Sequence, residues 1–241
     1  MKFALAIVIA FAASAFAAEK AVPVATPAPA LHDESLHYVV NWPSGLSLGE
    51  CQFAAHRLAA ADGQPSHWDF QLNLDAAVPG FEVHDQIHST ASPEFCSSET
   101  DKNYVQGKRK AEEKITFDPH ANTATRETLN GGGKSDVSTP ACAKDPLAYL
   151  AFLRHELVEG RLPPPQPIVF GAVYRIRVVF AGAETVKVGG KPVETDHLTA
   201  TLKGPSSDVT FDIFFARDAV RTPVLVRVPL SLAAFTMELA R

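Results

Sequence analysis

The sequence predicts a mainly β protein whose antiparallel sheet packs against a single helix. Apolar and polar residues alternate with a period of two in many segments, for example over residues 67–74, and this period is typical of strands with one buried face. Turn residues separate these segments at short intervals, which favours antiparallel strands joined by hairpins. Only residues 145–159 have the length and the end signals of a helix.

The first residues have the pattern of a secretory signal peptide. Met1-Lys2 is a short basic region, residues 3–13 are all apolar, and small residues surround Ala17 and Ala18. The apolar run is shorter than the about 20 residues that cross a membrane comfortably. No cysteine lies at the expected cleavage site, which argues against a lipid anchor. We therefore predict a signal peptide over residues 1–18 and an exported protein, with the periplasm of a Gram-negative type of envelope as its compartment.

The rest of the chain divides into a tether and one domain. Residues 19–35 include an Ala/Pro-rich stretch without periodicity, which favours extended conformers and cannot form a core. Residues 36–241 form the predicted β domain, within the size that one such domain reaches. No later stretch is apolar enough to span a membrane, and we predict that the protein is not transmembrane. The net charge of −5 without a basic stripe argues against nucleic acid as a partner.

The predicted strands before the helix form a meander. Residues 37–42 end at Pro43, residues 48–58 end at a turn over 61–65, and residues 67–74 and 81–89 alternate clearly. Residues 108–118 are more charged but place Ile115 and Phe117 on one face, and residues 122–129 precede a turn at Gly131-Gly132-Gly133. The charged run Lys108-Arg109-Lys110 with Glu112-Glu113 is interpreted as solvated and not as a binding patch.

The helix has marked ends and an unusual composition. Asp145 is a good N-cap, Pro146 suits the first helical position, and Gly160 suits the C-terminal stop. Apolar residues cover more than one stripe of its surface, so the helix should be largely buried. Arg154 and Glu156 are the polar exceptions.

Alternation resumes after the proline-rich connector at residues 163–165. Residues 172–180 place apolar side chains on one face and Arg175 and Arg177 on the other. Gly189-Gly190 is typical of a hairpin turn. Further strands are predicted at residues 198–202, 209–215, 224–228 and 235–239.

The chain contains three cysteines, Cys51, Cys96 and Cys142. In an oxidising compartment two of them should pair. Cys96 and Cys142 both lie in polar, turn-rich stretches, whereas Cys51 lies in an apolar run where a thiol acts as a small hydrophobe. We predict a Cys96–Cys142 disulfide; the alternative is two idle surface thiols.

One motif suggests a serine hydrolase. Gly45-Leu46-Ser47-Leu48-Gly49 matches a nucleophile elbow, and Asp145 or Asp196 with His197 could complete a triad around Ser47. That fold needs alternating strands and helices, however, and too little chain precedes Ser47 to build the strands before an elbow. We interpret the motif as a hairpin turn and predict no catalytic residues; the hydrolase remains a remote alternative.

Two further patterns are weaker. Gly131-Gly132-Gly133-Lys134-Ser135 resembles the end of a phosphate-binding loop, but Thr128 stands where its first glycine belongs. His84 and His88 would lie about 13 Å apart on one strand face, too far to share an ion without a third element. His155-Glu156 lacks a second histidine at metalloprotease spacing. No metal and no cofactor are therefore predicted.

A tight cluster of paired carboxylates is missing from the sequence. Asp208, Asp212 and Asp218 lie on or beside predicted strands. We expect them to form ordinary salt bridges with Arg217 or Arg221.

Several stretches together resemble the exported-protein family called domain of unknown function 3108 (DUF3108). They are residues 38–50, Phe117-Asp118, residues 145–154, 174–179, 186–190 and 218–228. The resemblance covers most of residues 36–241. It implies an envelope-located protein, similar in outline to lipoprotein carriers or to spiral β-barrels, and it implies no activity. On this outline a curved antiparallel sheet, an open or spiral β-barrel, wraps around one central helix.

The leading functional hypothesis is a non-enzymatic exported protein that binds a lipid-like or apolar ligand. Many Phe, Val and Leu residues face inward on the predicted strands, and only one helix covers them. Such an interior is either packed solid or left partly open, and both remain open at this point. The alternative is a structural or interaction protein that supports the cell envelope and docks through a sheet edge. The sequence assigns no ligand-binding residues.

Overall fold

The computed structural model describes residues 31–61, 65–78, 80–205, 208–229 and 234–240. The predicted signal peptide and residues 19–30 of the predicted tether lie outside the described residues. The described chain forms fourteen strands and one α-helix, listed here in order: β1 (Glu34–Asn41), β2 (Ser47–Leu58), β3 (His67–Val78), β4 (Phe81–Ala91), β5 (Ser97–Gln106), β6 (Arg109–Asp118), β7 (Thr123–Thr128), β8 (Lys134–Ser138), α1 (Pro146–Val158), β9 (Gln166–Val169), β10 (Val173–Val188), β11 (Lys191–Lys203), β12 (Asp208–Ala216), β13 (Pro223–Pro229) and β14 (Ala234–Leu239).

All fourteen strands belong to one antiparallel sheet in the order β8-β7-β6-β5-β4-β3-β2-β1-β14-β13-β12-β11-β10-β9. The first and last strands are neighbours, with Tyr38 opposite Leu239, so the two halves of the chain join in the middle of the sheet. The sheet is not closed by hydrogen bonds, because β8 and β9 remain its two edges. The predicted mainly antiparallel β fold is confirmed.

The sheet curls until one edge lies inside the other arm. Val169 of β9 packs against Ile115, Phe117 and Ala124 on the inner face of β6 and β7. Side-chain packing therefore closes the curl where hydrogen bonds do not, which gives a spiral rather than a closed ring. β-Bulges, for example between Thr90 and Ala91, supply local bending.

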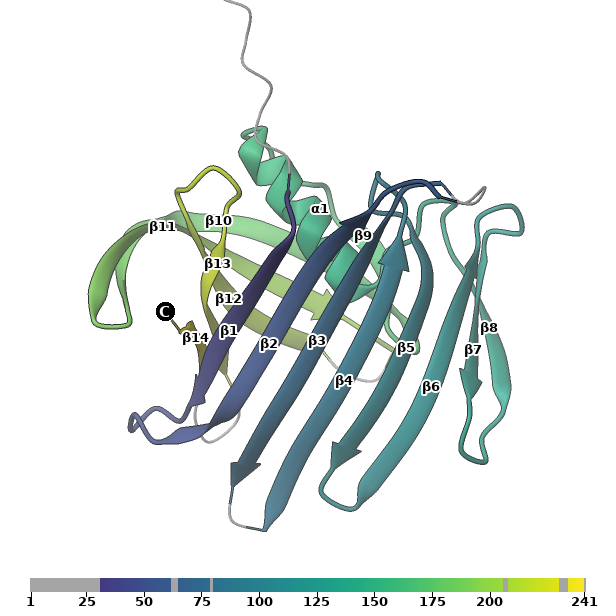
Figure 1. The fold of residues 1–241 in the computed structure, drawn as a ribbon, viewed down its shortest axis with the longest axis horizontal. Coiled ribbons are helices and arrows are strands. Elements are labelled where there is room, and N and C mark those ends of the chain that lie inside the picture. Colours follow the sequence, from purple (N-terminus) through teal and green to yellow (C-terminus); the bar gives the residue numbers. More distant parts are fainter. Residues whose placement is uncertain (1–30, 62–64, 79, 206–207, 230–233, 241) are drawn as a thin grey trace, which may run out of the picture.

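Helix α1 lies between the two arms of this spiral, with β1–β4 in front of it and strands of the other arm behind it (Figure 1). Leu147, Ala148 and Ala151 pack against the inner faces of β1–β4. Leu153 and Leu157 pack against β9–β12 on the other side. Two walls thus cover the helix, which explains why its apolar residues are not confined to one stripe. The predicted central, buried helix is confirmed.

The β10–β11 hairpin turns at Gly189-Gly190, and β10 continues eight residues beyond the predicted strand end, to Val188. A register shift between Phe180 and Gly182 bends it. Its tip packs Val186 and Val188 against Phe214 and neighbouring residues, which form a separate small cluster. The bend is visible at the left of Figure 1.

Three strands were not predicted. β5, with the sequence SSETDKNYVQ, and β8, with KSDVS, carry almost no apolar side chains, and β9, with QPIV, is short and contains a proline. A period-two apolar signal cannot appear where a strand's inward side chains are themselves polar. β8 and β9 are the sheet edges, where short strands and proline are common.

Candidate functional site

An apolar hollow lies directly beneath α1. Its volume is about 240 Å³. Its walls come from both arms of the sheet and its roof from the helix, and its principal residues are Tyr38, Cys51, Phe53, Leu72, Tyr149, Leu150, Leu153, Ile176, Val178, Ala200, Leu202 and Ile213. Protein interiors normally contain few voids larger than a water molecule. This interior is therefore not packed solid beneath its helix.

A second apolar hollow of about 270 Å³ continues the first away from the helix. All of its lining residues are apolar, among them Val40, Leu74, Val83 and Val228. Met237 on β14 lines both hollows, so they adjoin at this side chain. Together they form an apolar path along the inner face of the sheet.

Two of the residues that line the first hollow, Tyr38 and Tyr149, carry a hydroxyl group. The Tyr38 hydroxyl donates to the Pro223 carbonyl at 2.8 Å. The buried Tyr149 hydroxyl has no hydrogen-bond partner among the described residues. Burial raises the pKa of both hydroxyls, so each stays protonated. Burial also raises the pKa of the Cys51 thiol to about 12, which keeps it neutral.

A third hollow, of about 320 Å³, is lined mostly by charged and polar side chains from β4–β7. At its centre Lys102 donates to Glu113 at 2.7 Å, and Arg126 also pairs with this carboxylate. The side chains of Lys102 and Glu113 are only 7% and 2% exposed. The Lys102 ammonium also lies 4.1 Å from the centre of the Phe170 ring, at a distance typical of a cation–π contact.

Burial and pairing act on the charges of this polar hollow in opposite directions. Burial disfavours the charged form of Glu113, but hydrogen bonds from Arg126 and Lys102 outweigh it and hold the Glu113 pKa below its ordinary value. Burial lowers the pKa of Lys102, although its bond to Glu113 opposes this. Burial raises the pKa of Asp85, which accepts from Gln106 at 2.8 Å.

The polar hollow adjoins the apolar ones across β3 and β4. Leu74, which lines the second apolar hollow, lies directly opposite Asp85 of the polar hollow. Leu72, which lines the first, lies opposite Ile87. Around the hollows, the inner surface of the spiral therefore changes from apolar side chains on β1–β3 to the charged side chains Asp85, Lys102, Glu113 and Arg126 on β4–β7.

Two anchors fix the N-terminal end of the helix over the first hollow. The buried Asp145 carboxylate accepts from the backbone N–H groups of Leu147 and Ala148 at 2.8 and 3.2 Å, as an N-cap. It also accepts from the hydroxyls of Ser89 and Ser97. These bonds tie the first turn of the helix to β4 and β5.

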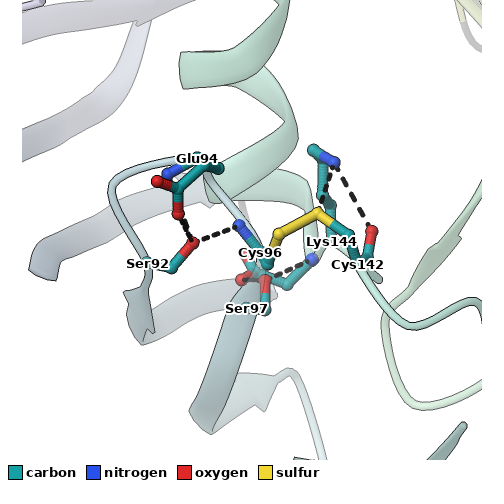
Figure 2. The surroundings of a disulfide bond; sticks show 7 residues. Ser92, Glu94, Cys96, Ser97, Cys142 and Lys144 are labelled. Carbon is teal, nitrogen blue, oxygen red and sulfur yellow. Dashed lines mark hydrogen bonds between the residues drawn. A yellow bond between two sulfur atoms is a disulfide. The ribbon is translucent and has the colours of Figure 1, made fainter. Parts of the chain in front are cut away.

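The disulfide is the second anchor, and the prediction that pairs Cys96 with Cys142 is confirmed. Their Cα atoms are 4.7 Å apart, and Cys51 is free and buried. Figure 2 shows the bond beside the start of the helix, with Lys144 donating to the sulfur and the carbonyl of Cys142. The disulfide therefore joins the loop before β5 to the segment that leads into the helix.

The helix is also fixed near its C-terminal half, by Arg154. This residue, expected as a polar exception on the helix, is 1% exposed. It pairs with Glu34 on β1, and its Nε donates to the carbonyls of Val220 and Arg221 at 3.0 and 3.1 Å. The helix ends at Val158, and Gly160 follows with a positive φ of 71° that favours glycine.

The candidate hydrolase residues do not form a triad in the described structure. Ser47 is exposed at the start of β2, after the turn that contains Gly45, and no described hydrogen bond joins it to a histidine. His197 lies on β11, stacks on Phe214, and pairs with Glu184 and Asp212. Asp145 is occupied at the helix N-terminus. The geometry agrees with a hairpin whose turn lies directly before Ser47.

Other predicted polar residues have ordinary surface partners. His84 pairs with Asp75 and His88 with Asp69. Among the described residues, no group of three or more His, Cys, Asp or Glu side chains could hold a metal ion. Lys134 and Ser135 begin β8 and not a helix, unlike the residues that follow a phosphate-binding loop.

The expected salt bridges of Asp208, Asp212 and Asp218 with Arg217 or Arg221 are wrong. Both arginines pair with Asp196 on β11 instead, at 2.8 Å. Asp218 accepts from the backbone N–H groups of Val220 and Thr222, as is common for aspartate in a turn. The three aspartates were expected as partners because they are close to the two arginines in sequence. The observed partner, Asp196, lies instead on the neighbouring strand β11.

The interpretation of the charged run at residues 108–113 as solvated was wrong for one of its members, Glu113, whereas Arg109 is exposed as expected. Glu113 is buried in the ion pairs with Lys102 and Arg126, and Arg109 lines the polar hollow. The register explains this, because Glu113 lies opposite Lys102 across β5 and β6. The sequence does contain a period-two pattern for β5, because Thr100, Lys102, Tyr104 and Gln106 occupy alternate, inward-facing positions. All four residues are polar, so the pattern does not appear as an alternation of apolar and polar residues.

In the part of the chain that the structure describes, no helix has the length and apolar character needed to cross a membrane. Residues 37–240 match the family model described as "Protein of unknown function (DUF3108)", and the chain belongs to this family. Among proteins with curated annotation, none matches the chain.

Solved structures similar to this chain include the β-barrel-like protein of domain of unknown function DUF1849 from Brucella abortus. It has a TM-score of 0.62 at 8% sequence identity, over 88% of this chain and 97% of that chain. This likeness supports the β-barrel-like fold alone. A "putative lipoprotein" from Parabacteroides distasonis has a TM-score of 0.32 at 8% identity, with the same coverage of 88% and 97%.

Proposed function

We propose that this DUF3108 protein is an exported, non-enzymatic envelope protein that binds a lipid-like or other apolar ligand beneath α1. The observation that carries the proposal is the apolar hollow of about 240 Å³ between the helix and both arms of the sheet. An apolar cavity of about 150 Å³ already binds benzene. The adjoining hollow of about 270 Å³ adds apolar volume beside the first, so the two together have more room than a single ring needs.

The Tyr149 hydroxyl supports a ligand with at least one polar atom. Buried tyrosine hydroxyls usually find a hydrogen-bond partner, and this one has none among the described residues. It lies on the helix, at the roof of the apolar hollow. An ester, hydroxyl or ether oxygen of a bound amphiphile would satisfy it.

Two features support export to an oxidising compartment. Residues 1–18 have the pattern of a signal peptide. The Cys96–Cys142 disulfide is of the kind that persists in extracytoplasmic proteins. Both agree with a periplasmic location.

The alternative of an interaction protein that docks through a sheet edge has less support. The edge strand β8 has five residues, carries Lys134 and is mostly exposed. The other edge strand, β9, has four residues including Pro167, and its Val169 packs against β6 and β7. Short strands, charge, proline and covering are the features that discourage strand addition at an edge.

The test uses adjacent residues of β11 that face opposite sides of the sheet. Leu202 lines the first hollow, whereas Thr201 is bonded to Thr210 on the exposed face. Wild-type protein should bind the neutral fluorescent probe N-phenyl-1-naphthylamine with a saturable signal. Leu202→Trp should abolish this signal by filling the hollow, and Thr201→Trp should keep it. No saturable binding by the wild type, or equal binding by both variants, would contradict the proposal.

A further inference from the structure

We infer that the ligand is an anionic amphiphile whose head group also carries a hydrogen-bond donor, and that this head group lies in the polar hollow of β4–β7. The inference rests on the proposed function, because it places the ligand's chain in the apolar hollows. It adds the chemical class of the ligand and the residues that recognise its head.

The three hollows lie next to one another. The apolar hollows and the polar one lie on the same inner face, and they meet where Leu74 is opposite Asp85. Apolar surface on one side and charged groups on the other match a molecule with a chain and a head. A purely apolar ligand would leave the polar hollow, of about 320 Å³, unused.

The charge balance of the polar hollow favours an anion. Three cations line it, Lys102, Arg109 and Arg126, against two carboxylates, Asp85 and Glu113. Glu113 accepts from both Lys102 and Arg126, so its charge is already matched within the cluster. The Arg109 guanidinium donates to the Tyr104 hydroxyl at 3.2 Å and lies over the Tyr104 ring, and among the described residues it forms no salt bridge. An arginine without a carboxylate at the rim of the hollow suits a phosphate or carboxylate group.

Two buried atoms define what the head group must offer. The Arg126 Nε donor and the Asp85 Oδ1 acceptor are both buried, and neither has a hydrogen-bond partner in the described structure. Buried polar atoms are normally hydrogen-bonded. A head group with an anionic oxygen would satisfy Arg126, and a hydroxyl or ammonium group on the same head would satisfy Asp85. This pair of requirements selects an anion that also bears a donor.

Gly171 lines the polar hollow next to the Lys102–Glu113 ion pair. It has a positive φ of 81°, which L side chains rarely adopt. A Cβ atom at this position would lie 3.2 Å from both the Glu113 carboxylate and the Lys102 ammonium. The backbone therefore approaches the ion pair more closely than another residue would allow.

The experiment measures displacement of bound N-phenyl-1-naphthylamine by ligands that separate chain, charge and donor. Oleoyl lysophosphatidylglycerol has all three, monooleoylglycerol lacks the charge, oleate lacks the donor, and glycerol 3-phosphate lacks the chain. Lysophosphatidylglycerol should displace the probe at a concentration about tenfold or more below that of monooleoylglycerol, with oleate between them. Glycerol 3-phosphate should not displace it.

Variants test whether the preference for the charged lipid comes from residues of the polar hollow. Arg126→Gln and Arg109→Gln should each raise the concentration of lysophosphatidylglycerol required, by about tenfold, and leave monooleoylglycerol unchanged. Arg161→Gln is the matched control, because Arg161 is exposed and pairs with Glu156 outside the hollows. Arg109 is itself exposed, so its substitution tests the idea even if Arg126→Gln fails to fold.

The outcomes distinguish this inference from the proposed function. Equal displacement by the charged and neutral lipids, or unchanged displacement in Arg109→Gln, would overturn the head-group site while leaving apolar binding intact. Binding of glycerol 3-phosphate, measured by calorimetry, as tightly as lysophosphatidylglycerol would show a site for free phosphoesters and would also overturn the inference. Failure of the wild type to bind the neutral probe would instead remove the proposed function on which it rests.

Discussion

Glu34 and Arg154 form a buried ion pair that joins the first strand to the central helix. The Arg154 Nη2 atom donates to the Glu34 carboxylate at 3.0 Å, and Nη1 donates to the other carboxylate oxygen. The two side chains are 8% and 1% exposed, and they are separated by 120 residues in sequence. The pair therefore fixes the roof of the apolar hollow to the wall beneath it.

Removing one partner of the buried Glu34–Arg154 ion pair should destabilise the protein more than breaking an ion pair on the surface. Glu34→Ala leaves the Arg154 guanidinium buried without its carboxylate, and we expect a loss of about 3–5 kcal/mol in the free energy of unfolding. Arg161→Ala breaks the exposed pair with Glu156 and should cost less than about 1 kcal/mol. Urea unfolding followed by circular dichroism measures both. Equal losses would show that the buried pair does not anchor the helix.

The disulfide should contribute to stability mainly through the unfolded chain. It joins residues 46 positions apart. A closed loop of that length corresponds to about 4 kcal/mol in the chain-entropy model. The double variant Cys96→Ser/Cys142→Ser should have a free energy of unfolding lower by about this amount, as measured by urea unfolding. Dithiothreitol should lower the free energy of unfolding of the wild type to the same value. If dithiothreitol lowered the stability of the double variant as well, the effect could not be assigned to this bond.

Features that depend on local sequence could be predicted, because their physical causes are local. Asp145 and Pro146 mark the helix start through capping and the fixed φ of proline, and these signals need no tertiary information. The alternation in β3 appears because one face, with Phe70 and Leu72, meets an apolar core. The Cys96–Cys142 pairing followed from the polar, turn-rich surroundings of both residues.

The candidate polar site could not be predicted, because it depends on strand register and on the curl of the sheet. Lys102 and Glu113 meet only because β5 and β6 pair in one register. Phe170 reaches Lys102 only because the sheet curls until β9 lies inside the opposite arm. The Arg154–Glu34 ion pair could not be predicted either, because the sequence around each residue gives no indication of its partner. Inward-facing polar residues resemble surface residues until the fold shows which face they occupy.

Cys51 should report on occupancy of the first hollow. Its thiol lines that hollow, and burial raises its pKa to about 12. Because the thiolate is the reactive form, iodoacetamide should label Cys51 slowly at pH 8 in the folded protein and rapidly in urea. A ligand that fills the hollow should slow the labelling further. Mass spectrometry of the alkylated peptide measures the rate, and Cys51→Ala is the control that must give no label. Rapid labelling of the folded protein would contradict a dry, apolar environment for this thiol.

Acid should weaken the polar cluster through Glu113. Its pKa in the folded protein lies below the ordinary value of 4.5, because hydrogen bonds from Arg126 and Lys102 outweigh the effect of burial. The unfolded chain therefore binds a proton more readily than the folded one as the pH falls through that range. The stabilisation by this carboxylate is present above about pH 4.5 and is lost as the pH falls through the folded pKa.

The acid prediction is tested by comparing two proteins, because Asp118, Glu156 and Asp212 also have lowered pKa values and contribute to the same loss. The double variant Lys102→Met/Glu113→Leu removes the two most buried charges together and leaves Arg126, whose side chain is 35% exposed and can be hydrated, as the remaining charge. Its free energy of unfolding should fall less steeply than that of the wild type between pH 6 and about pH 3, as measured by urea unfolding at each pH. The single variant Glu113→Gln leaves Lys102 and Arg126 without their shared carboxylate and should be destabilised by about 3 kcal/mol even at pH 7. If the wild type and the double variant showed the same pH dependence, folding would not give the Glu113 carboxylate hydrogen bonds that favour its charged form. The cluster that lines the polar hollow would then be more hydrated than its burial indicates.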